Sequence, residues 1–141
     1  MAKPWFTLTV VTVFNNEQIG IGIRAQGPAR RKGRYGPILL DFEEALDGTH
    51  AGATRAALRA LQLAHEKGWD PVRIRLKDRD AHKRLKKLLK GHPAKCDDAS
   101  KQFLELASGF EEVAGRRILR GKGAQVKRRA RKAIGHCPIR K

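Results

Sequence analysis

The stretch that decides the fold is Phe6–Phe14 (FTLTVVTVF), which contains no charged side chain. β-Branched and aromatic residues favour strands, and the lack of polarity is typical of a strand inside a sheet. Residues 15–18 (NNEQ) predict a turn, and residues 19–23 (IGIGI) alternate as a returning strand. We therefore predict that the sheet begins with an antiparallel hairpin whose first strand is central.

The residues after the hairpin predict a third strand, a long helix and a fourth strand. A basic loop containing Gly and Pro spans residues 26–37, and the third strand runs from Ile38 to about Glu43. The helix lies between the break at residues 47–49 (DGT) and Gly68, which ends it. Residues 72–76 (VRIRL) alternate as a strand with one buried face. One face of the helix is predicted from Ala57, Leu58, Leu61, Ala64 and His65.

Two more helices, a strand and a basic C-terminal helix complete the predicted order. The helices span about 80–90 and 97–107, and the strand spans about 112–119. The final helix has an apolar stripe at helical spacing, formed by Val126, Ala130, Ala133 and Ile134. The order β-β-β-α-β-α-α-β-α predicts one α/β domain over residues 1–141, with a mixed sheet of about five strands and helices on both faces. The basic helix and a short tail occupy about 123–141.

The charge of the chain points to a polyanionic partner. Lys and Arg number 31 against 14 Asp and Glu, a formal net charge of +17. The cations cluster in three segments, 24–34, 77–95 and 116–141, and the last segment contains no acid. Such clustering is typical of nucleic-acid binding. A membrane surface is the weaker alternative, because no apolar run approaches the ~18 residues of a spanning helix and no signal-peptide pattern begins the chain.

The cysteines indicate a cytoplasmic or other reducing intracellular compartment. Two cysteines cannot build a disulfide framework. His92, Cys96, His136 and Cys137 could supply zinc ligands, but two of them are adjacent and no Cys-x-x-Cys spacing is present. Ordinary reduced thiols are therefore preferred over a metal site, and we expect no cofactor.

Three stretches resemble the ribonuclease H-like family, of the ribonuclease HI type. Gly52–Leu61 (GATRAALRAL) is similar to the first-helix pattern T-N-N-R-x-E-L-x-A-L. Val72–Asp78 (VRIRLKD) resembles the fourth strand, which normally ends in a catalytic Asp, and Ile118–Ala133 resembles the ending V-P-R-E-x-N-x-x-A-D-x-L-A-x-x-A. The resemblance covers residues 6–134 and implies the ribonuclease H-like fold.

The departures from that family bear on function. Its nucleases hold two divalent cations with four carboxylates, which activate water and bridge the scissile phosphate. The matching positions here are Ala57, Lys77 and Lys127, with Thr12 the best match within the neutral stretch 11–13. Because lysines repel Mg²⁺, the resemblance implies a protein without catalytic or metal-binding residues that is not an enzyme.

An alternative alignment would restore one ligand. Asp78 follows Lys77 directly, but a one-residue slip turns a strand side chain to the other face, so Asp78 would need a bulge. Asp41, Glu43, Glu44 and Asp78 are predicted to be solvated surface acids. An active metal-dependent nuclease is therefore the least favoured of three possible functions.

We interpret the sequence as a catalytically inactive nucleic-acid-binding protein that grips a duplex through its phosphate backbone. Structured RNA or an RNA–DNA hybrid is the preferred partner and double-stranded DNA is possible; the sequence does not predict protein partners. The second alternative is a basic structural component of a ribonucleoprotein particle, such as a ribosome-associated protein. The predicted contact residues are Arg30, Arg31, Lys32, Arg34, Lys77, Arg120, Lys122, Lys127, Arg128 and Arg131.

Overall fold

A computed structural model describes residues 5–28, 36–48, 52–77, 79–90, 98–117 and 124–133. The described elements follow the predicted order of three strands, a helix, a strand, two helices, a strand and a helix. They are β1 (Phe6–Phe14), β2 (Gln18–Gln26), β3 (Ile38–Asp47), α1 (Gly52–Lys67), β4 (Val72–Leu76), α2 (Arg79–Leu89), α3 (Asp98–Ala107), β5 (Val113–Arg117) and α4 (Ala124–Ala133).

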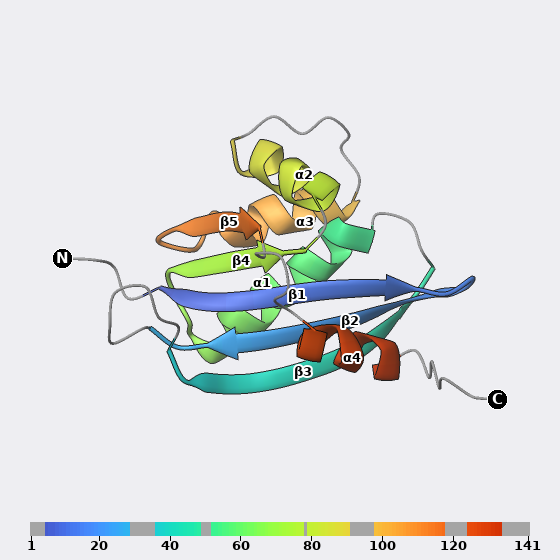
Figure 1. Cartoon of the computed structure of the whole chain (residues 1–141). Coiled ribbons are helices and arrows are strands. Elements are labelled where there is room, and N and C mark those ends of the chain that lie inside the picture. The colour runs from blue at the N-terminus through green and yellow to red at the C-terminus, as the bar shows by residue number, and fades with distance from the viewer. Residues whose placement is uncertain are drawn as a thin grey trace.

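The strands form one mixed sheet in the order β3-β2-β1-β4-β5 (Figure 1). β1 pairs antiparallel with β2, and β2 pairs antiparallel with β3. β4 lies parallel to β1 on its other side, and β5 lies parallel to β4. β1, which has no charged side chain, is therefore central, as predicted.

The sheet separates two helical layers, which confirms the prediction of helices on both faces. Leu8 and Val10 of β1 and Ile74 of β4 belong to the main core, which α1 covers. Successive side chains of a strand point to opposite faces. Val11 accordingly lies on the other face, where it forms a separate small cluster with Val126 of α4. Figure 1 shows α4 lying across β2 and β3.

Gly22 allows α4 to approach the sheet closely. A Cβ added to Gly22 would collide with the backbone carbonyl oxygen of Val126 and would lie 3.0 Å from the backbone nitrogen of Ala130. Any larger residue would therefore separate the helix from β2. The absence of a side chain at this position sets the height of α4 above the sheet.

Three details differ from the predictions. β2 extends past Ile23 to Gln26, because its residues keep pairing with β1 as far as Thr7. β3 extends past Glu43 to Asp47, because its residues keep pairing with β2 as far as Gln18. His65 is exposed and does not join the apolar face of α1, since its side chain borders an open groove between α1 and α3. None of the described helices is long and apolar enough to cross a membrane.

Candidate nucleic-acid interface

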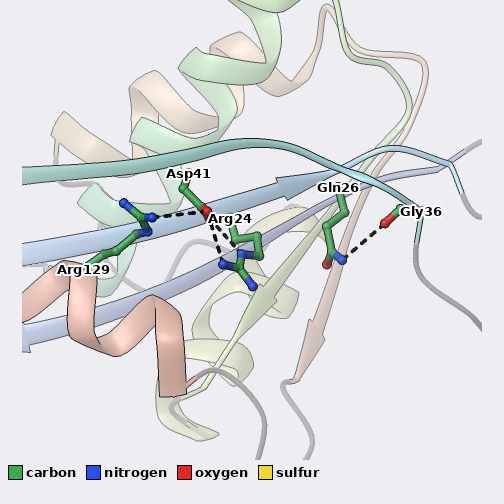
Figure 2. A network of polar contacts seen from close by, with 5 residues as sticks. All are labelled: Arg24, Gln26, Gly36, Asp41 and Arg129. Carbon is green, nitrogen blue, oxygen red and sulfur yellow. Dashed lines mark hydrogen bonds and ion pairs between the residues drawn. The ribbon is translucent and has the colours of Figure 1, made fainter.

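One edge of α4 is neutralised by acids of β3. Arg129 Nη2 lies 3.5 Å from Asp41 Oδ2, and Lys132 Nζ lies 3.9 Å from Glu43 Oε1. Asp41 also accepts hydrogen bonds from Arg24 of β2, at 2.8 Å from Nε and 3.2 Å from Nη2 (Figure 2). Arg129 and Lys132 therefore have acids of the protein itself beside them.

The pair between Arg24 and Asp41 is the best-defined polar contact beneath α4. The hydrogen bonds from Arg24 lower the pKa of the Asp41 carboxyl below its ordinary value, and Arg129 adds to the effect. The same contact raises the pKa of Arg24. The Asp41 side chain is only 19% exposed, so the pair is partly shielded from water. Asp41 thus links β2, β3 and α4.

The other acids of β3 were also predicted to be solvated, and the structure gives them partners. Glu44 Oε1 lies 2.9 Å from Arg59 Nε of α1. The Arg59 guanidinium lies over the Phe42 ring, 4.9 Å from its centroid. Both Glu43 and Glu44 are half-buried. The prediction that these carboxylates are solvated was wrong, because their partners are distant in sequence and meet them only in the folded sheet.

The opposite edge of α4 carries two cations, Lys127 and Arg131, which lie near a third cation, Lys77. The positive charge of Lys77, at the end of β4, lowers the pKa of Lys127, and Arg131 and partial burial act in the same direction. Lys77 and Arg131 are exposed, and Lys127 is partly exposed. We call Lys77, Lys127 and Arg131 the α4 cluster. Arg128 is exposed on the same helix.

The sheet register shows what lies beside the α4 cluster. β1 and β4 are paired as far as Val10 and Leu76, so Val11 is the next residue of β1 beside Lys77. Val11 faces α4, whereas alternation turns Thr12 to the α1 face. The residue of β1 nearest the cluster by register is therefore Val11, and the match of Thr12 to the first-strand carboxylate stays a prediction.

Ala57, the remaining position matched to a catalytic carboxylate of the ribonuclease H-like family, lies away from the α4 cluster. Ala57 is 1% exposed and lines a small apolar cavity with Leu76 and Leu85. Divalent Mg²⁺ requires oxygen ligands, whereas Ala57 presents a methyl group and Lys77 and Lys127 present ammonium groups. Within the described ranges, no group of three or more His, Cys, Asp or Glu side chains could hold a metal ion. The residues at these positions do not fit the two cations that the resemblance implies.

Several predicted residues lie outside the described ranges. They are Arg30, Arg31, Lys32, Arg34, Asp78, Arg120, Lys122 and the possible zinc ligands His92, Cys96, His136 and Cys137. The roles predicted for these residues therefore stay predictions.

A set of arginines on the sheet was missed. Arg73 and Arg75 of β4 lie on the same face as Lys77, and Arg116 of β5 pairs with Arg75. The alternation in VRIRL was used only to predict a buried apolar face. The same alternation also places the charged residues of β4 together on the opposite face.

Solved structures that are similar to this chain include ribonucleases H. The chain is similar to ribonuclease H1 of the halophilic archaeon Halobacterium salinarum, with 17% identity, a TM-score of 0.71 and coverage of 94% of this chain and 98% of that one. The chain is also similar to the N-terminal ribonuclease H domain of a Mycobacterium tuberculosis protein, solved as a fusion with maltose binding protein. The sequence identity is 14% and the TM-score is 0.72, with coverage of 95% of this chain and 96% of that one. A third similar structure is LC11 ribonuclease H1, isolated from compost by a metagenomic approach and solved with an RNA/DNA hybrid. Its sequence identity is 16% and its TM-score is 0.67, with coverage of 93% of this chain and 97% of that one.

These likenesses show that the chain has the ribonuclease H-like fold, as the sequence predicted. No protein-family model matches the sequence, and no curated protein matches it.

Proposed function

We propose that this chain, which has the ribonuclease H-like fold, binds nucleic acid through the phosphate backbone at the α4 cluster and does not cleave it. The observation that supports this most is the convergence of Lys77, Lys127 and Arg131 from two separate elements. Their mutual repulsion is expressed in the lowered pKa of Lys127. Arg129 and Lys132 of α4 have acids of β3 beside them, so the α4 cluster is better suited to an external anion than that edge of the helix.

A phosphate group would relieve this repulsion. Ammonium and guanidinium groups hold phosphate oxygens through charge-assisted hydrogen bonds. They cannot lower the pKa of a water molecule as a bound metal ion does. Replacing carboxylates by lysines therefore keeps the attraction for the backbone and removes the means of hydrolysing it.

We infer that the ligand is a duplex, with an RNA–DNA hybrid or structured RNA preferred. The LC11 enzyme of the same fold was solved with an RNA/DNA hybrid. Aromatic residues make up only 6% of the chain, which disfavours a platform that stacks unpaired bases. Backbone contacts would also accept double-stranded DNA. A panel of hybrid, double-stranded RNA, double-stranded DNA and single strands at two salt concentrations ranks these ligands.

Charge reversal tests the location of the site. Lys77→Glu with Lys127→Glu should weaken binding to a hybrid at least about tenfold, because two attractive contacts become repulsive. The matched control is Lys86→Glu with Lys87→Glu, two exposed positions of α2 that give the same change in net charge. Equal losses in the two double variants, with circular dichroism unchanged, would refute this location.

Cleavage is tested separately. The protein should leave the RNA of a hybrid intact in Mg²⁺ or Mn²⁺. Metal-dependent cleavage by a clean preparation, lost in the Asp78→Asn variant, would overturn the proposed inactivity and leave the binding proposal standing.

A further inference from the structure

Lys127 and Lys132 are two lysines of α4 with opposite electrical surroundings. Lys132 Nζ lies 3.9 Å from Glu43 Oε1 of β3, so a carboxylate is beside it. Lys77 and Arg131 lie close enough to Lys127 to lower its pKa through their positive charge. Because the two lysines belong to one helix and differ in what lies beside them, Lys132 serves as an internal comparison for the chemistry of Lys127.

The fold fixes the position of Lys127 relative to the other cations of the α4 cluster. Lys127 directly follows Val126, whose backbone carbonyl oxygen lies against Gly22 of β2. Lys77 comes directly after the last residue of β4, and Arg131 follows Lys127 by one helical turn. The three charges are therefore brought together by the backbones of a strand and a helix that are packed on one sheet.

These surroundings make the Lys127 amine more reactive than that of an isolated surface lysine. The charge of Lys77 is the largest influence that lowers its pKa, and the charge of Arg131 is the next. Only the neutral amine is a nucleophile, and a neighbouring cation activates a lysine in this way. Lys127 is partly exposed, and Lys77 and Arg131 are exposed, so a small molecule can reach the cluster.

Lys77 and Arg131 also suit one class of acylating molecule. Ammonium and guanidinium groups hold phosphate oxygens through charge-assisted hydrogen bonds. A small acyl phosphate, such as acetyl phosphate, carries an anionic phosphate as the leaving group on its acyl carbon. When that phosphate binds the two cations, the acyl carbon is brought to the amine of Lys127. The carboxylate of Glu43 beside Lys132 repels the same anion.

We propose that Lys127 is a modification site, at which small acyl phosphates acylate the protein without an enzyme. The neutral Nζ of Lys127 attacks the acyl carbon, a nitrogen–carbon amide bond forms, and the bond from that carbon to the phosphate oxygen breaks. Inorganic phosphate leaves with the electron pair, and the nitrogen loses a proton to solvent.

The modification would control the α4 cluster. An acylated lysine carries no charge, so one of the cations that face an external anion is lost. The reactivity of Lys127 does not depend on what the protein binds, whereas the consequence, weaker binding of nucleic acid, rests on the proposed function. The experiments separate the two.

The first test measures acetylation rates with acetyl phosphate, by mass spectrometry after digestion with a protease that does not cleave at lysine. Lys127 should react at least about threefold faster than Lys132, since half a pKa unit changes the neutral fraction of an amine by that factor. In the Lys77→Gln variant this preference should shrink, whereas Lys86→Gln, an exposed position of α2, should leave it unchanged. Equal rates at Lys127 and Lys132 in the unsubstituted protein would refute the proposal.

A donor without phosphate tests the role assigned to Lys77 and Arg131. With the acetyl ester of N-hydroxysuccinimide, the preference for Lys127 over Lys132 should be smaller than with acetyl phosphate, because only the reactivity of the amine remains. An equal preference with both donors would overturn the assignment to acyl phosphates.

The consequence for binding is tested with an RNA–DNA hybrid. Lys127→Gln, which removes the charge as acylation does, should weaken binding about three- to tenfold and reduce the magnitude of the salt slope by about 1, and Lys132→Gln should have a smaller effect. A bound hybrid should also protect Lys127 from acetyl phosphate. If Lys127 is preferentially acetylated but is neither protected nor needed for binding, the modification site stands and the proposed location of the nucleic acid falls. If binding needs Lys127 but acetyl phosphate does not prefer it, the modification site falls and the proposed function stands.

Discussion

Gly22→Ala is the substitution that most sharply tests how α4 is held on the sheet. The added methyl group would collide with the carbonyl oxygen of Val126 and crowd the nitrogen of Ala130. Both atoms belong to helix backbone, so no side-chain rotation can relieve the contact, and the helix or the strand must shift. Overpacking of this kind costs about 1–3 kcal/mol of unfolding free energy.

Urea denaturation measures this cost. With a denaturant dependence of about 1–3 kcal/mol per molar urea, the midpoint should fall by roughly 1 M. The matched control is Gly109→Ala, because a Cβ at Gly109 would meet only the carbonyl oxygen of Leu106 at 3.5 Å. Its expected effect lies between zero and a stabilisation of about 1 kcal/mol, since alanine restricts the unfolded chain.

The same substitution should also weaken nucleic-acid binding. Lys127 follows Val126 directly, so a shift of the helix moves Lys127 relative to Lys77 on β4. Affinity for a hybrid should fall under conditions in which the variant is still folded by circular dichroism. A Gly22→Ala protein as stable as Gly109→Ala would show that α4 does not depend on this close contact.

Three further outcomes are expected. If six or more phosphates are contacted, log K should fall with log salt at a slope of about −5 or steeper on duplex DNA; a flat response would exclude the basic surface as the interface. Asp41→Asn should lower the unfolding free energy at pH 7 by about 1–3 kcal/mol relative to Glu66→Gln, because charged hydrogen bonds are lost. Since the folded pKa of Asp41 lies below 3.8, this difference should be present above about pH 4 and shrink as the pH falls through the folded value; a pH-independent difference would contradict the ionic role. Lys127→Arg should retain more affinity than the unsubstituted protein as the pH rises toward 10, because the pKa of Lys127 lies below 10.5; identical alkaline profiles would exclude Lys127 from the contact.

Much of the fold could be predicted because the pattern of apolar and polar residues along each element matched which of its faces is buried in the folded protein. β1 has no charged side chain on either face, and α1 packs on one side of it and α4 on the other. β4 alternates because only its even positions face the main core. His65 was misplaced because helical spacing gives the direction of a side chain but does not show whether a neighbouring element covers it.

The candidate site could be predicted only in part. The basic character of α4 and the lysines at positions 77 and 127 are readable from sequence. The neutralisation of Arg129 by Asp41 was not, because it depends on the register between β2 and β3 and on the height of α4. Pairwise electrostatics depend on distances of a few ångströms, and such distances between remote residues exist only in the folded chain.

The sequence by itself determined the order of elements, the excess of positive charge and the absence of carboxylates at positions 57, 77 and 127. These are properties of single residues and of local repeats, which do not change when the chain folds. The tertiary structure decided which cations of α4 meet an acid of β3 and which meet Lys77. It also placed Arg116 beside Arg75, because the pairing of strands distant in sequence is set by how the whole sheet buries its core.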